Sequence, residues 1–237
     1  MVKLVNPLML ALDVDTDSEA FEIAAKLKGK LGAIKLGPRL NMRYGAPLVA
    51  KMAEIAPVFV DNKYLDIPST MEAAVRATFA AGATFATVHA WSGAEALERL
   101  AKVEAELNQT RPFQILTVTI LTSFNAATLP PGLASESIES HVAKLADLAW
   151  TKGLTGIVCS PQELDLLRRR SAQAFLVAPG VRMPGDSAGD QKRVETPENA
   201  MRSGASAIVV GRPIVEALDP LSVVEKILAS AAAGKGN

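Results

Sequence analysis

The sequence has 237 residues, of which 49% are hydrophobic and 21% charged, and its 25 basic and 25 acidic residues give a formal net charge of zero. This composition supplies enough apolar side chains for a large core and excludes an intrinsically disordered chain. A neutral chain has no global field that attracts nucleic acid or an anionic membrane, so any anionic ligand is expected to be small and held locally.

The expected compartment follows from the apolar runs and the cysteine content. The apolar runs have the length of strands, and none approaches the roughly 18 residues of a membrane span. The single cysteine, Cys159, cannot form an internal disulfide, and the start of the chain lacks a signal peptide. We therefore expect a cytoplasmic protein without membrane or nucleic-acid partners. No linker divides the sequence, so residues 1–237 are expected to form one domain.

Short apolar runs typical of β-strands alternate with helical periodicity along the whole chain. Strands are predicted at residues 8–13, 33–36, 58–60, 84–89, 114–119, 156–159, 175–178 and 207–210. Helices are predicted near residues 18–29, 46–55, 70–81, 93–107, 136–151, 161–170, 197–203 and 220–232, and the small, polar tail from residue 231 is expected to fray. Eight βα units predict a single (β/α)8 TIM barrel, whose catalytic face lies at the carboxyl ends of the strands.

The stretch 61–70 (DNKYLDIPST) carries a dense charge cluster directly after the third predicted strand. Because alternate residues of a strand share a face, Asp61 and Lys63 are expected to point the same way, with Asp66 in the following loop. Asn62 is expected to face the helices, where it needs a hydrogen-bond partner. The cluster would then lie at the catalytic face of the barrel.

Other polar residues at or just after strand ends are predicted to converge on the same face. They are Asp13, Lys35, His89, Thr122, Ser123, Gly211 and Arg212. The charges of Lys35, Asp61, Lys63 and Asp66 alternate in sign, and flanking carboxylates favour the ammonium form of a lysine, which suits a proton donor. A salt-bridge network bracing the barrel rim is the alternative, and spacing alone does not separate the two. His89 is expected to support or pack the site.

The segment Gly211-Arg212-Pro213 after the eighth strand predicts a phosphate site. A glycine lets backbone N–H groups approach an anion, and an arginine offers it two parallel hydrogen bonds. A simple turn with a solvated arginine is the alternative. The loop 179–191 after the seventh strand is expected to be a lid, from which Arg182 and Gln191 would close over the same anion.

The pattern Asp61-x-Lys63-x-x-Asp66-Ile67-Pro68-x-Thr70 resembles the signature of the orotidine 5′-monophosphate decarboxylase family, bacterial type. Residues 10–13, 34–37, 121–123, 179–182, 189–191 and 211–213 continue the resemblance in the family's order over nearly the whole chain. Two positions depart from the pattern: Asn62 stands where a hydrophobic residue is usual, and Ser69 where asparagine is common.

The resemblance implies cofactor-free removal of CO2 from C6 of the orotate ring, which gives uridine 5′-monophosphate in de novo pyrimidine synthesis. Lys63 would protonate C6, Asp61 would lie against the departing carboxylate, and Lys35 would complete the charge network. The family pattern also implies an obligate homodimer with shared sites, because Asp66, Ile67 and Thr70 would serve the neighbouring subunit. Substrate contacts are implied for Asp13 and Lys35 at the ribose, Thr122 at the pyrimidine, Gln191, Gly211 and Arg212 at the phosphate, and Arg182 near the lid.

Two other functions stay open. A barrel decarboxylase or aldolase acting on a sugar phosphate, such as the 3-keto-L-gulonate 6-phosphate decarboxylase type, resembles the same Asp-x-Lys-x-x-Asp core but uses magnesium. No extra carboxylate pair is arranged for that ion, and the lid ending Asp190-Gln191 favours a nucleotide. A silent barrel that only binds nucleotide is the third possibility, and the intact Lys35, Asp61, Lys63 and Asp66 set argues against it.

Overall fold

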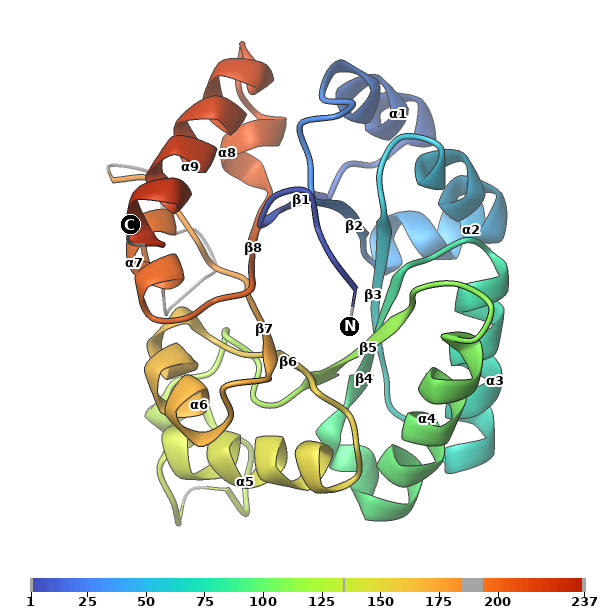
Figure 1. Ribbon diagram of the computed structural model, residues 1–237, viewed down its shortest axis with the longest axis vertical. Helices are drawn as coiled ribbons and strands as arrows, with labels where there is room; N and C mark the ends of the chain where they lie inside the picture. Colours follow the sequence, from blue (N-terminus) through green and yellow to red (C-terminus); the bar gives the residue numbers. More distant parts are fainter. Residues whose placement is uncertain (1, 134, 185–193, 236–237) are drawn as a thin grey trace.

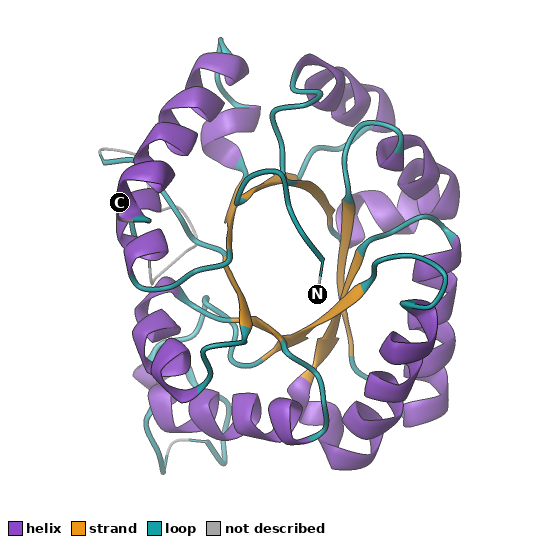
Figure 2. Ribbon diagram, viewed as in Figure 1, coloured by secondary structure: helices purple, strands orange, loops and turns teal. Residues whose placement is uncertain are grey.

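The computed structural model describes residues 2–133, 135–184 and 194–235. Eight parallel strands close into a barrel in which each strand pairs with its neighbours in sequence and β8 pairs with β1 (Figure 1). The helices form a ring around the strands (Figure 2). The predicted (β/α)8 barrel is confirmed.

The strands are β1 (Leu8–Leu12), β2 (Ala33–Leu36), β3 (Val58–Tyr64), β4 (Phe85–His89), β5 (Gln114–Val118), β6 (Gly156–Val158), β7 (Phe175–Ala178) and β8 (Ala207–Val210). The helices are α1 (Asp17–Lys26), α2 (Pro38–Ala53), α3 (Pro68–Ala80), α4 (Gly93–Leu107), α5 (Ile138–Thr151), α6 (Leu164–Arg170), α7 (Pro197–Arg202), α8 (Arg212–Val215) and α9 (Pro220–Gly234). Short 3₁₀ turns lie at η1 (Ala90–Ser92), η2 (Ala126–Thr128) and η3 (Pro161–Glu163).

Side chains that alternate along the strands fill two separate cores. Inward-facing residues such as Met9, Phe59, Phe85 and Phe175 pack inside the barrel, where the rings of Phe85 and Phe175 stack with centroids 5.9 Å apart. Outward-facing residues of the same strands pack against the helices in a larger cluster. Each large apolar side chain that is fully buried contributes about 1.5–3 kcal/mol, so the barrel is a rigid support for its loops.

Two predicted boundaries near the charged stretch are wrong. β3 does not end at residue 60 but continues to Tyr64, so the charges lie on the strand itself. α2 begins at Pro38 rather than near residue 46, because proline suits the first turn of a helix. The helical periodicity did not reveal this start, because the helix is interrupted at Gly45, where φ is 56°.

The helix ends contain one wrong prediction. Ser160 and Glu163 form a capping box before α6, and α3 begins at Pro68 after Ile67. The tail does not fray at residue 231, since α9 continues to Gly234. A Cβ at Gly234 would lie 2.0 Å from the carbonyl oxygen of Glu198, so the glycine permits close packing of α9 on α7. None of the helices in the described ranges has the length and apolar character needed to traverse a membrane.

Candidate active site

A cavity of about 580 Å³ lies at the carboxyl ends of the strands. Its floor is apolar and includes Phe59, Val158 and Val209. Eight of the predicted site residues line it: Asp13, Lys35, Asp61, Lys63, Thr122, Arg182, Gly211 and Arg212. Residues from six loops and strands far apart in sequence are thus brought to one concave, mixed polar and apolar space, which is the usual form of a small-molecule site.

An array of alternating charges crosses this cavity. The Nζ of Lys63 lies 3.0 Å from Oδ2 of Asp61, and the Nζ of Lys35 lies 3.5 Å from the same oxygen. Lys35 also lies 3.4 Å from Oδ1 of Asp13. The side chains of Asp61 and Lys35 are each 12% exposed, so water screens their interaction weakly. Two ammonium groups therefore share one buried carboxylate.

Thr87 on β4 forms a hydrogen bond with the other carboxylate oxygen of Asp61. Its hydroxyl donates to Oδ1 of Asp61 at 3.0 Å and accepts the backbone N–H of Lys63 at 2.9 Å. Lys63 has a φ of 51°, and it is the one residue other than glycine with a positive φ in the described ranges. Such a conformation costs about 1–3 kcal/mol for an ordinary side chain and concentrates at functional sites. The charged pair is therefore held on a strained strand end.

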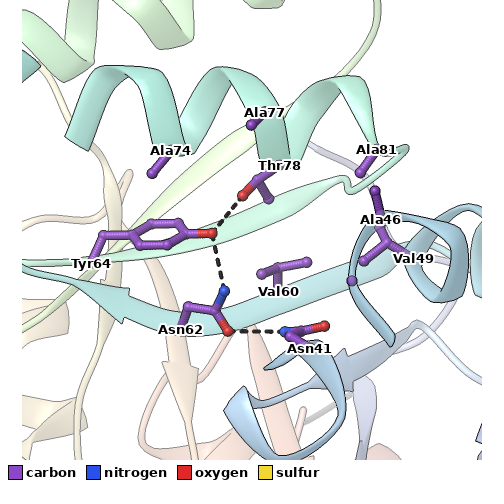
Figure 3. Close-up of a pocket in the computed structure, with 11 residues that line it drawn as sticks. Asn41, Ala46, Val49, Val60, Asn62, Tyr64, Ala74, Ala77, Thr78 and Ala81 are labelled. Carbon is purple, nitrogen blue, oxygen red and sulfur yellow. Dashed lines mark hydrogen bonds between the residues drawn. The ribbon is translucent and has the colours of Figure 1, made fainter. Parts of the chain in front are cut away.

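The outer face of the same strand end carries a polar network (Figure 3). Asn62 accepts from Nδ2 of Asn41 at 2.9 Å and donates to the hydroxyl of Tyr64 at 3.1 Å. The Tyr64 hydroxyl lies 2.7 Å from Oγ1 of Thr78 on α3. These residues line a separate cavity of about 220 Å³ between β3, α2 and α3. Asn62 faces the helices as predicted, and its side chain connects β3 to Asn41 of α2 by a hydrogen bond.

Three predicted site residues lie elsewhere, and a fourth is not among the described residues. Asp66 is exposed and accepts the N–H of Ile67 at 2.7 Å, and within the described ranges it forms no ion pair, so Lys63 is not flanked by two carboxylates in one chain. Ile67 is 64% exposed, and Thr70 is exposed in the first turn of α3. Gln191, with most of the expected lid, lies outside the described residues.

The turn after β8 has the form expected of an anion site. Gly211 precedes the short helix α8, which begins with Arg212, and the Arg212 side chain is exposed toward the cavity. A Cβ at Gly211 would lie 3.2 Å from both Cβ and O of Ala11, so a larger residue would crowd β1. The first N–H groups of a helix have no acceptor within that helix, so a glycine turn that leads into a helix suits an anion.

The two segments that flank the loop after β7 are hydrogen-bonded to each other. Val181 and Glu195 form a β-bridge, and the N–H of Arg182 donates to the carbonyl of Glu195 at 2.9 Å. The buried guanidinium of Arg182 donates to the carbonyl of Val181 at 2.8 Å. Both ends of this loop are therefore fixed beside the cavity.

His89 lies next to the charge array at the end of β4. Burial, and secondarily the positive charge of Lys63, lowers its pKa to about 4, so the imidazole is neutral at pH 7. It lines a third cavity, of about 350 Å³, together with Trp91 and Phe124. A neutral ring adds no further charge beside Lys63.

Sequence reasoning missed three residues of the site: Thr87, Arg39 and Glu216. Arg39 donates to the backbone carbonyl of Asp13 at 2.8 Å and lines the main cavity with Glu216. Arg39 was missed because the start of α2 was placed too late. Thr87 was detectable, because alternation with Phe85 and His89 points it into the barrel.

The fold and site define a (β/α)8-barrel enzyme with a shared Lys-Asp-Lys array beside the Gly211-Arg212 turn. The sequence model of the Orotidine 5'-phosphate decarboxylase / HUMPS family matches residues 6–227. The chain belongs to this family. The expectation of a carboxy-lyase is confirmed at the level of the family and its named relatives.

Individual relatives cover almost the whole chain. Orotidine 5'-phosphate decarboxylase of Dichelobacter nodosus is 39% identical over 227 residues, which are 95% of this chain and 98% of the relative. The Parasynechococcus marenigrum protein of the same name is 42% identical over 219 residues, covering 90% and 89%. The crystal structure of the Lactobacillus acidophilus decarboxylase has a TM-score of 0.82 at 30% identity and covers 95% of this chain and 99% of that one.

Proposed function

We propose that this protein converts orotidine 5′-monophosphate to uridine 5′-monophosphate and CO2 without a cofactor, in cytoplasmic de novo pyrimidine synthesis. The observation that carries the proposal is the buried Asp61 carboxylate shared by Lys35 and Lys63. This array faces the same cavity as Gly211 and Arg212. Membership of the family and the names of the relatives support the substrate.

The proposed reaction breaks the bond between C6 and its carboxylate, and the electron pair stays on C6. No carbonyl is placed to delocalise that carbanion, so fixed charges must stabilise it. The ammonium of Lys63 stabilises the developing charge and then gives a proton to C6 as CO2 leaves. Lys63 regains its proton from solvent after the product dissociates.

Asp61 is proposed to orient Lys63 rather than to act alone. Its Oδ2 lies 3.0 Å from Nζ of Lys63, so the carboxylate fixes the direction of the ammonium group. It would also lie against the substrate carboxylate before that group departs. Lys35, which bridges Asp61 and Asp13, offsets the negative charge that accumulates when an anionic substrate enters.

The rest of the cavity offers one partner for each part of the nucleotide. Asp13, which is 56% exposed, and Lys35 are proposed to bind the ribose hydroxyls, and Thr122 the amide edge of the pyrimidine. The phosphate is assigned to Gly211 and Arg212, with Gln191 and Arg182 from the loop after β7. Binding energy from the remote phosphate would then assemble the site around the reacting carbon.

The active form is proposed to be a homodimer of single-domain barrels with shared sites. Asp66 forms no ion pair in the described part of its own chain. Leu65 and Ile67 beside it are 56% and 64% exposed, so they offer apolar surface that a partner subunit could cover. Asp66, Ile67 and Thr70 would reach the cavity of the partner subunit.

Turnover of orotidine 5′-monophosphate in the presence of a metal chelator tests the function. The purified protein should consume the substrate, release CO2 and form uridine 5′-monophosphate at the same rate with and without the chelator. Activity that requires added magnesium, or turnover of 3-keto-L-gulonate 6-phosphate instead, would assign the chain to the sugar-phosphate branch. Binding of the nucleotide without turnover would leave a silent barrel.

A further inference from the structure

β3 and β4 are out of register where the charged pair lies. Val60 pairs with Ala86 and Tyr64 with Val88, so β3 advances four residues while β4 advances two. Between these outward-facing pairs, β3 points two residues into the barrel, Asp61 and Lys63. β4 points one, Thr87. Asp61 and Lys63 therefore share a single inward-facing neighbour on β4, Thr87.

The hydrogen bonds of Thr87 have a fixed direction. The backbone N–H of Lys63 can only donate, so the hydroxyl must accept from it, at 2.9 Å. The hydroxyl proton is then free for Oδ1 of Asp61, at 3.0 Å. Thr87 is fully buried, so water does not replace either bond. One hydroxyl thus holds both the strained backbone of Lys63 and the carboxylate of Asp61.

We propose that Thr87 is a positioning residue that sets the geometry of the Asp61 and Lys63 pair for catalysis, an inference that rests on the proposed function. Asp61 turns one oxygen to Thr87 and the other to the lysines. This division fixes the plane of the carboxylate, and with it the direction of the ammonium group. The outer network through Asn62 holds the same strand end from behind (Figure 3).

Thr87→Val and Thr87→Ser separate the hydroxyl from the packing. Valine keeps the shape but leaves the Lys63 N–H and one Asp61 oxygen without partners, whereas serine keeps both hydrogen bonds. We expect kcat for orotidine 5′-monophosphate to fall about 10- to 100-fold in Thr87→Val, since a buried hydrogen bond to a charged group is lost. KM should stay within about threefold, because the phosphate contacts are intact. Thr87→Ser should recover most of kcat.

Thr117→Val is the matched control. Thr117 pairs with Val88 on the adjacent strand, is fully buried, and alternates with Leu116 of the barrel interior, so it faces the helices. Its hydroxyl has no partner among the described residues. The same Thr-to-Val change there should leave kcat and KM at wild-type values.

The variant structures and the wild-type rate distinguish the two ways in which this reasoning can fail. In a crystal structure of Thr87→Val, we expect the Asp61 carboxylate to rotate and the Lys63 backbone to leave its positive φ. An unmoved pair, a wild-type kcat in Thr87→Val, or an equal loss in Thr87→Ser would overturn the role of Thr87. An inactive wild-type protein would instead overturn the proposed function, and the crystal structures would still decide whether the hydroxyl positions the pair.

Discussion

We expect replacement of Glu104 by glutamine to change how the free energy of unfolding depends on pH. Glu104 on α4 accepts the N–H of Ile115 at the start of β5, and burial raises its pKa to about 7 from an ordinary value of 4.5. The native carboxyl therefore binds its proton more tightly than the unfolded one. The contribution of Glu104 to the free energy of unfolding therefore falls by about 3 kcal/mol as pH rises from 4.5 to 7.

His89 has the opposite effect over nearly the same range. Its pKa is about 4 in the native protein against 6.5 for an ordinary histidine, so the unfolded chain binds the extra proton. Stability from this group rises by about 3 kcal/mol as pH increases from 4 to 6.5. The contributions of Glu104 and His89 thus nearly cancel between pH 4.5 and 6.5, and the wild-type protein should show a shallow dependence there.

Urea unfolding at fixed protein concentration between pH 4.5 and 7.5, followed by tryptophan fluorescence, measures this balance. Glu104→Gln keeps an acceptor for the Ile115 N–H but cannot titrate, so only the rise due to His89 should remain. Relative to wild type, the variant should gain about 3 kcal/mol between pH 4.5 and 7.5. Glu95→Gln, an exposed site on the same helix, should follow the wild-type curve. Parallel curves for Glu104→Gln and wild type would refute the buried-carboxyl reasoning.

Three further predictions concern the site. Lys63→Ala should abolish turnover in a steady-state assay but bind uridine 5′-monophosphate with wild-type affinity by calorimetry. The control Lys102→Ala, at an exposed lysine, should stay active. Lost nucleotide binding in Lys63→Ala would contradict the role of Lys63 as proton donor. Arg212→Ala should raise KM for the nucleotide at least about tenfold through a lost charged hydrogen bond, and an unchanged KM would place the phosphate elsewhere. Mixing inactive Lys63→Ala and Asp66→Ala subunits should restore activity, because one site of each mixed dimer keeps both residues; no recovery would argue against shared sites.

The barrel could be predicted from sequence because its strands are buried on both faces and its helices repeat regularly. The eight strand positions depend on local apolar runs, and all eight are present. α2 was shortened because the break at Gly45 divides its pattern, and the first turn is stabilised by the fixed φ of Pro38 rather than by apolar periodicity. Elements whose ends depend on backbone conformation are therefore the ones that periodicity places poorly.

The charged part of the site was also accessible from sequence, because charges at the ends of buried parallel strands are rare and meet at one face. Two other residues of the site gave a weaker signal. Strand alternation points Thr87 into the barrel, but its hydrogen bonds to Asp61 and Lys63 on β3 depend on the closed fold. The place of Arg39 depends on where α2 begins. Asp66 lies outside the array of its own chain, where Asp13 is the second carboxylate near Lys35.

Asp61 and Lys63 share a face as the alternation of a strand predicts, but a regular strand is not what keeps them together. Lys63 has a positive φ, and β3 has two more residues than β4 across this stretch. No glycine lies within residues 61–64 to accept such a conformation at low cost, so its support comes from Thr87, 24 residues away in sequence. The geometry of the pair is thus a property of the closed barrel, and a peptide with the same ten residues would not reproduce it.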